Sequence, residues 1–425
     1  MKTAAVVIFI TMYLLMILKS SRRTWFALGA AVLFVVAGFL TPAQALGAVN
    51  WNVLMMMSGT MIIVSYFIDS LMPGKLADIL MGKSSDIRSV IIFMSLFAGV
   101  ISAFIDNVAT VLMIAPVGLA VCKKLDVSPV PMILAISVSS NLQGAATLVG
   151  DTTSILLGDY AGMDFLDFFW MKGRPGIFFG VELGALATVP VMLFLFRRLR
   201  QPVKAEATTK VRDFVPTILL LAMIACLIML SFFPNKPSVA NGMVCLGFAL
   251  LCMILDLIRN RGESSIRSAL QELDLHTLFL LFGLFIAVKA ITEAGVIAEL
   301  AELISNVGGG NLFLLFTVIV WSSVLISAFV DNIPYVATML PVISQLSAAL
   351  GIEPYVLFFG LLTGATLGGN ITPIGASANI TGIGILKKNG YDVSFKEFMK
   401  IGLPFTLTAV LCGYLFIWFV WGGGI

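Results

Sequence analysis

The sequence predicts an all-α polytopic membrane protein made of two inverted-topology repeats. Each repeat is expected to hold five transmembrane helices, one of them interrupted, and one re-entrant helical hairpin. Three observations predict this class. Hydrophobic residues make up 59% of the 425 residues and charged residues only 12%, which lies far outside the usual range for a soluble domain. The apolar sequence divides into runs of spanning length, and the second half repeats the first at an offset of 225 residues.

The spans are predicted from run length, because a transmembrane helix needs roughly 20 mostly apolar residues. The ten predicted spans lie near 4–18, 24–41, 51–72, 129–158, 176–196, 214–233, 238–258, 275–293, 354–386 and 402–422. Two further apolar segments, 89–122 and 312–348, are each interrupted by an Asp-Asn pair that leaves both arms too short to span comfortably. We predict a re-entrant hairpin at each, surrounded by protein or a wet cavity. Amphipathic segments at 163–172 and 391–400 are expected to be helices on the membrane surface.

Basic residues predict the orientation, because Lys and Arg are enriched in cytoplasmic loops. Of the 26 Lys and Arg residues, 21 fall in alternate loops on one side of this layout. This predicts a cytoplasmic-membrane protein with both termini outside. The longest polar stretch joins the halves, so we expect residues 1–200 to form the first repeat, 201–213 a cytoplasmic linker and 214–425 the second repeat. The bilayer is the expected partner surface, and basic residues confined to short loops argue against nucleic acid.

The two halves share matched motifs. Residues 102–117 read SAFIDNVATVLMIAPV and residues 327–342 read SAFVDNIPYVATMLPV, with eight identities in sixteen positions. The same offset aligns 142–155 with 367–380 at five identical positions. Because each half carries an odd number of spans, the second copy must enter the membrane upside down. This is the inverted-repeat plan of secondary transporters.

Each hairpin carries an Asp-Asn pair at a depth where charge is costly. Asp106 and Asn107 stand in the first hairpin, and Asp331 and Asn332 in the second. One interpretation is that each Asp caps the second arm by accepting its free N–H groups. The other is a binding role, because a carboxylate at membrane depth marks a functional site by default. The two are compatible, and these four residues form a candidate Na⁺ site.

A glycine-rich polar stretch interrupts one span in each half, SSNLQGAATLVGDTTS at 139–154 and TGATLGGNITPIGASAN at 363–379. Such residues leave mid-span backbone groups unpaired, so bound ions or substrate are expected to satisfy them. Asp151 and Asn370 each face an alanine in the other repeat, and this broken symmetry marks them as site candidates. Weaker candidates, because such groups also bond locally to backbone, are Asn141, Thr147, Thr152, Thr153, Ser154, Thr372, Ser377 and Asn379.

Two further charges, Glu182 and Lys289, stand within apolar spans about 9 Å from the outer helix ends. They either pair with each other or extend to the membrane surface. The five cysteines form no CxxC pair and are expected to pack as small apolar residues.

The hairpin motifs and GGNITPIGASANI at 368–380 resemble the ion transporter superfamily, in the branch of ArsB/NhaD-type permeases and the melanosomal P protein. The resemblance covers nearly the whole chain and implies a dimeric transporter, with a scaffold and a hairpin-bearing transport domain in each protomer. Where P-protein-like relatives read GDPPN, this chain reads GDTTS at 150–154. Asp-Asn-Val at 106–108 and Asp-Asn-Ile at 331–333 replace the Ser-Asn-Thr of related sodium/dicarboxylate symporters. The last departure disfavours a carboxylate substrate.

Together these features predict a secondary active transporter that moves a small inorganic anion or metalloid oxyanion by alternating access, coupled to H⁺ or Na⁺. A Na⁺/H⁺ antiporter of the same fold is the alternative. A channel is disfavoured because the sequence lacks a four-fold filter, and an intramembrane aspartyl protease because Gly150-Asp151 lacks a GxGD context. No GxxxxGK[ST] motif occurs, and we expect neither an enzyme nor a cofactor other than Na⁺ as coupling ion.

Overall fold

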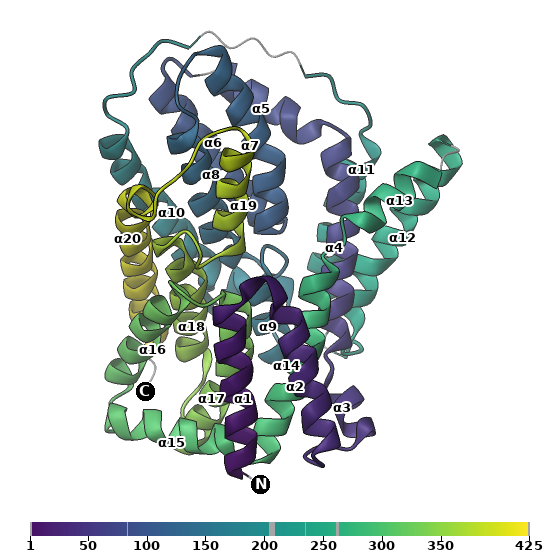
Figure 1. The fold of residues 1–425 in the computed structure, drawn as a ribbon, viewed down its shortest axis with the longest axis vertical. Helices are drawn as coiled ribbons and strands as arrows, with labels where there is room; N and C mark the ends of the chain where they lie inside the picture. Colours follow the sequence, from purple (N-terminus) through teal and green to yellow (C-terminus); the bar gives the residue numbers. More distant parts are fainter. Residues whose placement is uncertain (1, 83, 204–208, 234, 261–262, 424–425) are drawn as a thin grey trace.

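The computed structural model describes residues 2–82, 84–203, 209–233, 235–260 and 263–423, and it is almost entirely helical (Figure 1). The first half contains α1 (Lys2–Leu18), η1 (Ser20–Arg22), α2 (Arg23–Val36), α3 (Pro42–Ala48), α4 (Trp51–Asp69), α5 (Met72–Gly82), α6 (Ile87–Ser102), α7 (Asn107–Lys124), α8 (Val130–Gln143), η2 (Gly144–Ala146), α9 (Thr152–Tyr160), η3 (Phe165–Phe168), β1 (Trp170–Met171), β2 (Arg174–Pro175) and α10 (Ile177–Leu195). The second half contains α11 (Val215–Leu230), α12 (Ala240–Asn260), α13 (Glu263–Gln271), α14 (Leu275–Glu293), α15 (Val296–Gly308), α16 (Leu312–Ser327), α17 (Asn332–Leu350), α18 (Tyr355–Gly368), η4 (Gly369–Ile371), α19 (Ser377–Lys388) and α20 (Phe395–Trp421).

The predicted duplication is confirmed by the order of the helices. Elements α4 to α9 recur as α14 to α19, and α10 recurs as α20. Figure 1 shows α5 at the upper end of the molecule and its counterpart α15 at the lower end, so the two copies are inverted. The all-α fold class with inverted repeats is therefore correct.

The two halves interlock rather than lying side by side. Helix α4 packs along α12 of the other half, and its counterpart α14 packs along α2. Near the hairpins, α7 packs against α19 and α17 against α9, again across the halves. The repeats therefore build one body in which each half supplies walls for the other.

Each half contains the predicted hairpin and the predicted interrupted span. In the first hairpin, α6 ends at Ser102 and α7 begins at Asn107. In the second, α16 ends at Ser327 and α17 begins at Asn332. The interrupted spans leave the helical path after η2 and after η4 and resume in α9 and α19.

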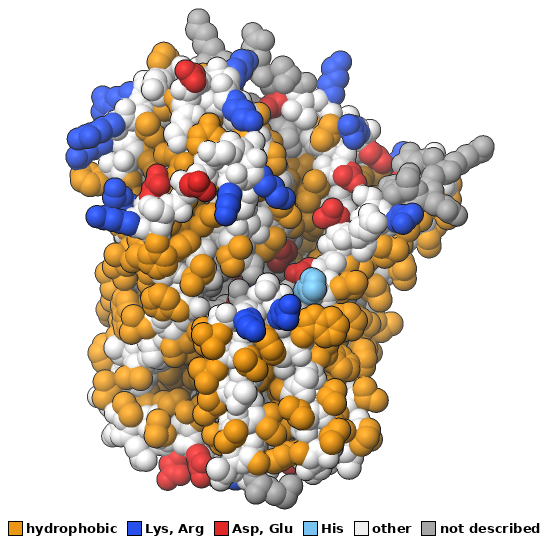
Figure 2. Space-filling view, in the orientation of Figure 1, with side chains coloured by type: hydrophobic (Ala, Val, Ile, Leu, Met, Phe, Trp, Pro, Cys, Tyr) orange, Lys and Arg blue, Asp and Glu red, His pale blue; other side chains and the backbone are white. Residues whose placement is uncertain are grey.

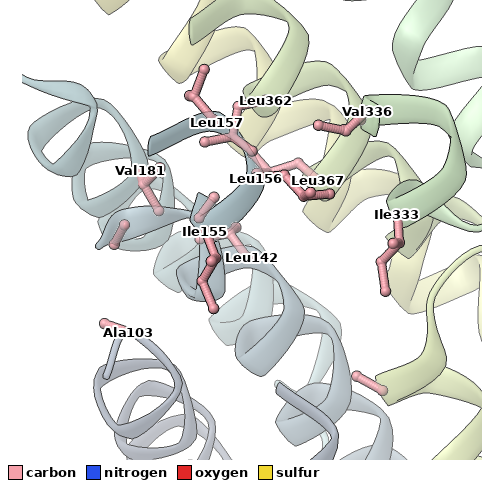
Figure 3. Close-up of a cluster of buried hydrophobic side chains, with 14 of the residues drawn as sticks. Ala103, Leu142, Ile155, Leu156, Leu157, Val181, Ile333, Val336, Leu362 and Leu367 are labelled. Atoms are coloured by element: carbon pink, nitrogen blue, oxygen red, sulfur yellow. The ribbon is translucent and has the colours of Figure 1, made fainter. Parts of the chain in front are cut away.

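Apolar packing joins the two interrupted spans at the centre. Figure 3 shows Leu156 and Leu157 of α9 beside Leu362 and Leu367 of α18, so leucines from opposite halves share one cluster. All four side chains are at most 4% exposed. This packing holds the two breaks in the helices at a common depth.

Fewer single helices of the described chain reach spanning length than the ten spans predicted. Seven helices among the described residues are long and apolar enough to cross a membrane, or eight if α15 and α16, which meet at 118°, are counted as one broken span. Two of the seven are the second hairpin arms α7 and α17, which were expected to be too short. They gain length because each continues helically through a proline, Pro116 in α7 and Pro341 in α17. Conversely, α2 ends at Val36 and is shorter than its predicted span.

Neither amphipathic segment is a separate surface helix. Residues 163–172 contain the short 3₁₀ turn η3 and strand β1, which pairs with β2 as an antiparallel ribbon. Residues 391–400 lead into α20, which begins at Phe395 with Ser394 as its N-cap and continues to Trp421. The amphipathic pattern there belongs to the polar first turns of a long helix.

The polar stretch between the halves lies at the basic end of the molecule. Figure 2 shows Lys and Arg side chains gathered over the upper end, where α5, α6 and α7 lie, and hydrophobic side chains over the lower part. The backbone N–H of Ile87 donates to Gln201 at 3.0 Å, and that of Arg212 donates to Ser70 at 2.9 Å. The described parts of this stretch thus contact both α6 and the end of α4. The boundaries at 200 and 213 stay a prediction.

Substitution of Gly150 tests the close contact between the first interrupted span and its hairpin. A Cβ at Gly150 would stand 2.6 Å from the Gly144 carbonyl oxygen and 2.7 Å from those of Ser102 and Ala103. We expect Gly150→Ala to destabilise the protein by roughly 1–3 kcal/mol, because backbone atoms cannot yield as a side chain would. Gly384→Ala is the control, since its Cβ meets nothing within 4 Å. Melting temperatures in detergent compare the two, and an unchanged Gly150→Ala would contradict the close packing.

Candidate functional site

A cavity of about 340 Å³ lies where the hairpin tips and the interrupted spans meet α4 and α14. Polar side chains from seven helices or their flanking residues line it. They are Ser65, Asp69, Asp106, Asn107, Asp151, Thr152, Ser268, Glu272, Asp274, Thr277, Asn332 and Ser377. Six of the residues proposed from sequence are therefore brought to one cavity: Asp106, Asn107, Asp151, Thr152, Asn332 and Ser377.

The cavity is strongly acidic. Asp69, Glu272 and Asp274 are exposed at its mouth, Asp106 is half-buried, and Asp151 is only 3% exposed. Within the described residues, no Lys, Arg or His side chain lines the cavity. A cation entering it therefore meets carboxylates of increasing burial.

The first hairpin tip confirms the capping interpretation. One oxygen of Asp106, Oδ2, accepts hydrogen bonds from the backbone N–H groups of Val108 at 3.0 Å and Ala109 at 3.1 Å. These bonds fix the carboxylate at the start of α7 and aim it at the cavity. None of the ion pairs found among the described residues involves Asp106, so its charge is available to a bound cation.

The second hairpin tip differs, because its carboxylate is neutralised. Asp331 caps α17 by accepting from the Ile333 N–H at 3.1 Å. It also forms an ion pair with Arg23 at the start of α2, in which the side chains are 15% and 22% exposed. Ser377 donates to the same carboxylate at 3.2 Å. The four residues proposed for Na⁺ therefore do not form one symmetric site, since Asp331 is already paired.

Asp151 occupies the centre between the two hairpins. Asn107 and Asn332, which are equivalent in the two repeats, each donate to it at 3.4 Å, one to each carboxylate oxygen. The Thr153 hydroxyl donates to Oδ2 at 2.6 Å. Three neutral donors surround this buried carboxylate, so its charge, like that of Asp106, lacks an ion pair among the described residues.

A chain of amides lies behind the cavity. Asn107 donates to Asn141 at 3.0 Å, and Asn141 donates to Asn370 at 3.1 Å. Asn379 also donates to Asn370, at 3.3 Å. All four side chains are buried, which makes this network a rigid support that orients Asn107 toward Asp151.

Three of the proposed hydroxyls do not line the cavity and instead connect backbone segments. Thr147 donates to the carbonyl of Ala103 at the end of α6, and Thr372 makes the equivalent bond to Ala328 at the end of α16. Ser154 donates to the Gly144 carbonyl at 3.2 Å. These bonds satisfy carbonyls at the helix breaks, which is the local bonding that competes with a ligand role.

The two outlying charges do not pair with each other. Lys289 forms an ion pair with Glu293 one turn further along α14, at 2.6 Å. Glu182 lies on α10 and takes part in none of the ion pairs found among the described residues. Neither side chain lines the acidic cavity.

Two helix N-termini at the cavity remain uncapped by side chains. The residues before α9 and α19, Asp151 and Ala376, make no side-chain cap, whereas α7 and α17 are capped by Asp106 and Asp331. Thr152 and Ser377, the first residues of the uncapped helices, line the cavity. Free N–H groups at a helix start attract anions. The site therefore combines unpaired carboxylates with two helix starts that lack a side-chain cap, of which α9 begins directly after the Asp151 carboxylate.

Several residues of the site escaped the sequence analysis. Asp69 and Asp274 lie at helix ends beside polar loops, where acidic residues are ordinary, and Arg23 belongs to a basic loop. Thr366 bonds to Thr153 at 2.9 Å and is the repeat equivalent of Asn141. The same comparison of repeats that selected Asp151 would have found Thr366.

Comparison with known proteins gives consistent matches along the chain. A family model described as a citrate transporter matches residues 13–362. An uncharacterized transporter of Mycobacterium bovis is 31% identical over 439 aligned residues, covering 98% of each chain. A 46 kDa membrane protein of Mycobacterium leprae is 31% identical over 437 aligned residues, again covering 98% of each. The P protein of Homo sapiens is 26% identical over 505 aligned residues, which cover 98% of this chain and 59% of that protein.

Two solved structures share the fold. The YdaH transporter of Alcanivorax borkumensis superposes with a TM-score of 0.59 and 14% identity, covering 92% of this chain and 89% of that one. MtrF of Neisseria gonorrhoeae, described among antimetabolite efflux pumps, superposes with a TM-score of 0.59 and 16% identity, covering 96% and 86%. At these identities the likeness shows the fold alone.

The ion pair at the second hairpin predicts a specific pattern of stability. Arg23→Met leaves the largely buried Asp331 charge without a partner. We expect the free energy of unfolding to fall by roughly 1–3 kcal/mol. This is less than the effect expected for a fully buried pair, because both groups are partly exposed. Adding Asp331→Asn should recover most of that loss. Arg22→Met, at the exposed neighbouring position, is the control. Thermal unfolding in detergent measures the four proteins, and a double variant no better than Arg23→Met would contradict the pairing.

Proposed function

This chain belongs to the citrate transporter family, and we propose that it is a secondary active transporter in which a cation bound beside Asp106 and Asp151 allows an anionic cargo to enter. The observation that carries the proposal is the acidic cavity. Five carboxylates line it and no basic side chain of the described chain does so. The cation is H⁺ or Na⁺, and the cargo is a small anion.

The requirement for a cation follows from the size of the charge effects. A unit anion about 4 Å from one unit negative charge meets roughly 4 kcal/mol of repulsion at an effective dielectric constant near 20. A helix N-terminus attracts an anion by roughly 0.3–2 kcal/mol. The two uncapped starts, at α9 and α19, therefore offset at most about one carboxylate, and the cavity holds five. An anion enters favourably only together with one or more cations.

The position of the cation site follows from which carboxylates are unpaired. Asp331 is neutralised by Arg23, whereas Asp106 and Asp151 have no ion-pair partner among the described residues. Their side chains both line the main cavity and also a small adjoining space next to Thr60 of α4. A proton on one of the two carboxylates, or a Na⁺ ion held with the Asn107 side chain, would neutralise one of the two unpaired charges.

The chemical class of the anionic cargo is proposed from the helix starts and from the family description. The uncapped starts of α9 and α19 support an anion, and inorganic anions and metalloid oxyanions remain candidates. The family description adds citrate, in spite of the Asp-Asn hairpin tips that disfavour a carboxylate substrate. A polyanion such as citrate requires more accompanying cations than phosphate does, and the five carboxylates of the cavity are consistent with this demand.

Cation exchange without an anion is the second candidate. The observation that favours it is the pair of unpaired carboxylates, since Asp106 and Asp151 would by themselves bind Na⁺ and H⁺ alternately. In this case the uncapped helix starts would bind water rather than cargo. The Na⁺/H⁺ antiporter proposed from the sequence therefore remains in consideration.

The orientation is also a proposal. The basic end seen in Figure 2 supports a cytoplasmic location for that end, so both termini would lie outside and the acidic cavity would open toward the cytoplasm. The cytoplasmic membrane is the expected location. The homodimer implied by the family resemblance stays a prediction, which the molecular mass in detergent would test.

Transport in proteoliposomes tests the function. The purified protein is reconstituted with an internal pH-sensitive dye and challenged with Na⁺, Li⁺, phosphate, sulfate, citrate and arsenite. We expect one anion to be taken up only with a Na⁺ or H⁺ gradient. Asp106→Asn and Asp151→Asn should each lower the coupled rate at least tenfold, because they remove the charge that binds the cation. Asp392→Asn, the same change at an exposed loop position, should keep the rate within twofold.

Three results would separate the alternatives. Proton movement triggered by Na⁺ or Li⁺ alone, and lost in Asp106→Asn, would favour the exchanger. Anion uptake at an unchanged rate in the absence of Na⁺, and without accompanying proton movement, would contradict cation coupling. Coupled uptake that survives Asp106→Asn and Asp151→Asn would move the cation site elsewhere.

A further inference from the structure

A second cavity of about 350 Å³ lies away from the acidic one and takes no part in the site described above. Its walls come from the second half of α14, the middle of α17, the end of α9 and the start of α4. The polar side chains among them are Asn50, Tyr160, Lys289 and Thr292. Lys289 is the one charged residue that lines it among the described residues.

The duplication makes this cavity the counterpart of the acidic one. Helices α4 and α14 align at an offset of 224 residues, one fewer than the hairpins, with identical residues such as Gly59 and Gly283. At this offset Met61, Val64 and Ser65 of α4, which line the first cavity, correspond to Phe285, Val288 and Lys289 of α14, which line the second. Asp274 in the first cavity likewise corresponds to Asn50 in the second. The two cavities therefore have equivalent walls, but Asn50 in the second takes the place of Asp274 in the first, and Lys289 takes the place of Ser65.

The two cavities lie toward opposite ends of the molecule. Helix α14 contributes Thr277 from its first turn to the acidic cavity and Lys289 from its second half to the other. At a rise of about 1.5 Å per residue these positions are roughly 18 Å apart along the helix. Helix α9 joins the two cavities, since Thr152 at its start lines the first and Tyr160 at its end lines the second.

The ion pair of Lys289 does not explain why a lysine stands there. The side chains of Lys289 and Glu293 are 43% and 50% exposed, and an i,i+4 pair of this exposure adds little to the stability of the protein. A lysine in an apolar span is costly at the helix centre and less costly toward the helix ends. The ammonium group has three donors, and Glu293 uses one. The remaining donors are available to a ligand in the cavity.

We propose that the second cavity is an anion-binding site centred on Lys289, which holds the anionic cargo on the side of the membrane opposite the acidic cavity. The proposal rests on the function proposed above, because it assigns a second station to the same cargo. Carboxylates line the first cavity, whereas the charged side chain that lines the second among the described residues is Lys289, whose ion-pair partner Glu293 stands outside the lining. An anion therefore binds at Lys289 without an accompanying cation, and it requires the cation only when it reaches Asp106 and Asp151.

Amine labelling tests the binding without requiring transport. The full-length protein in phosphatidylcholine liposomes permeabilised for access to both faces is treated with an amine-reactive acetylating reagent, and mass spectrometry measures the modification of Lys289. We expect millimolar citrate or phosphate to slow the labelling of Lys289 at least threefold relative to chloride at equal ionic strength. Lys172 is the internal control, because it forms a similar exposed pair with Glu353 at 2.5 Å outside the cavity.

Each alternative result overturns the proposal. Equal labelling of Lys289 in citrate, phosphate and chloride would show that no anion binds there. Equal slowing at Lys289 and Lys172 would show general screening. Slowing by added phosphatidylglycerol but not by citrate or phosphate would assign the lysine to a lipid headgroup rather than to cargo.

A kinetic comparison separates this site from the coupling site. In oriented proteoliposomes, Lys289→Ser, which restores the residue of the other repeat, should raise the KM for the anion about fivefold to tenfold from the Lys289 side and leave kcat within twofold. Lys289→Arg should keep the KM, and Lys172→Ser should match the unmodified protein. An unchanged KM in Lys289→Ser overturns the anion site while the coupled transport stands. Protection of Lys289 without any coupled uptake supports the site and contradicts the proposed function instead.

Discussion

The structure depends on one constraint, which is that backbone groups freed at membrane depth must find partners inside the protein. Two hairpin turns and two helix breaks free such groups in this chain. A threonine at each helix break donates a hydrogen bond to a backbone carbonyl of the neighbouring hairpin turn. Thr147 bonds to the carbonyl of Ala103, and Thr372 makes the equivalent bond to Ala328. Gly150 permits the close approach by lacking a Cβ. The irregular segments thereby become mutual supports, and their helix starts are held around a shared cavity.

The supporting hydrogen bonds are the same in both repeats, so the chemical character of the site depends on the residues that differ between them. Asp151 faces an alanine in the other copy, and it receives Asn107 from one hairpin and Asn332 from the other. The two hairpin carboxylates also become unequal, because only Asp331 meets a basic partner, Arg23. A symmetric scaffold thus carries one buried, unpaired carboxylate at its centre and one unpaired carboxylate at its side. In the proposed mechanism, this asymmetry gives one cation site rather than two.

The same principle acts at the two cavities. Their walls are repeated copies, yet one carries a cluster of carboxylates and the other carries Lys289. Inverted repeats build equivalent chambers on the two sides of a membrane, and single substitutions then give each chamber its own charge. In the proposed mechanism, the cation therefore binds first in the acidic cavity and the anion binds first at Lys289.

Sequence analysis alone predicted the helical membrane fold, the duplication, both hairpins, both interrupted spans and six of the side chains that line the cavity. These follow from local features: apolar run length, a repeated motif, and polar residues placed in apolar surroundings. It misjudged the second hairpin arms, because continuation of a helix through Pro116 or Pro341 depends on neighbours rather than on local propensity.

The contacts of individual side chains depend on how the two halves pack together. Arg23 is 308 positions from Asp331, and nothing in either local sequence predicts their contact. Likewise, Thr147 and Thr152 looked equivalent as hydroxyls in one broken span, but one bonds to a hairpin carbonyl and the other lines the cavity. The local sequence specifies which groups are polar and buried. Which of them remain free for a ligand depends on the helices that pack against them, and these come from the other half of the chain.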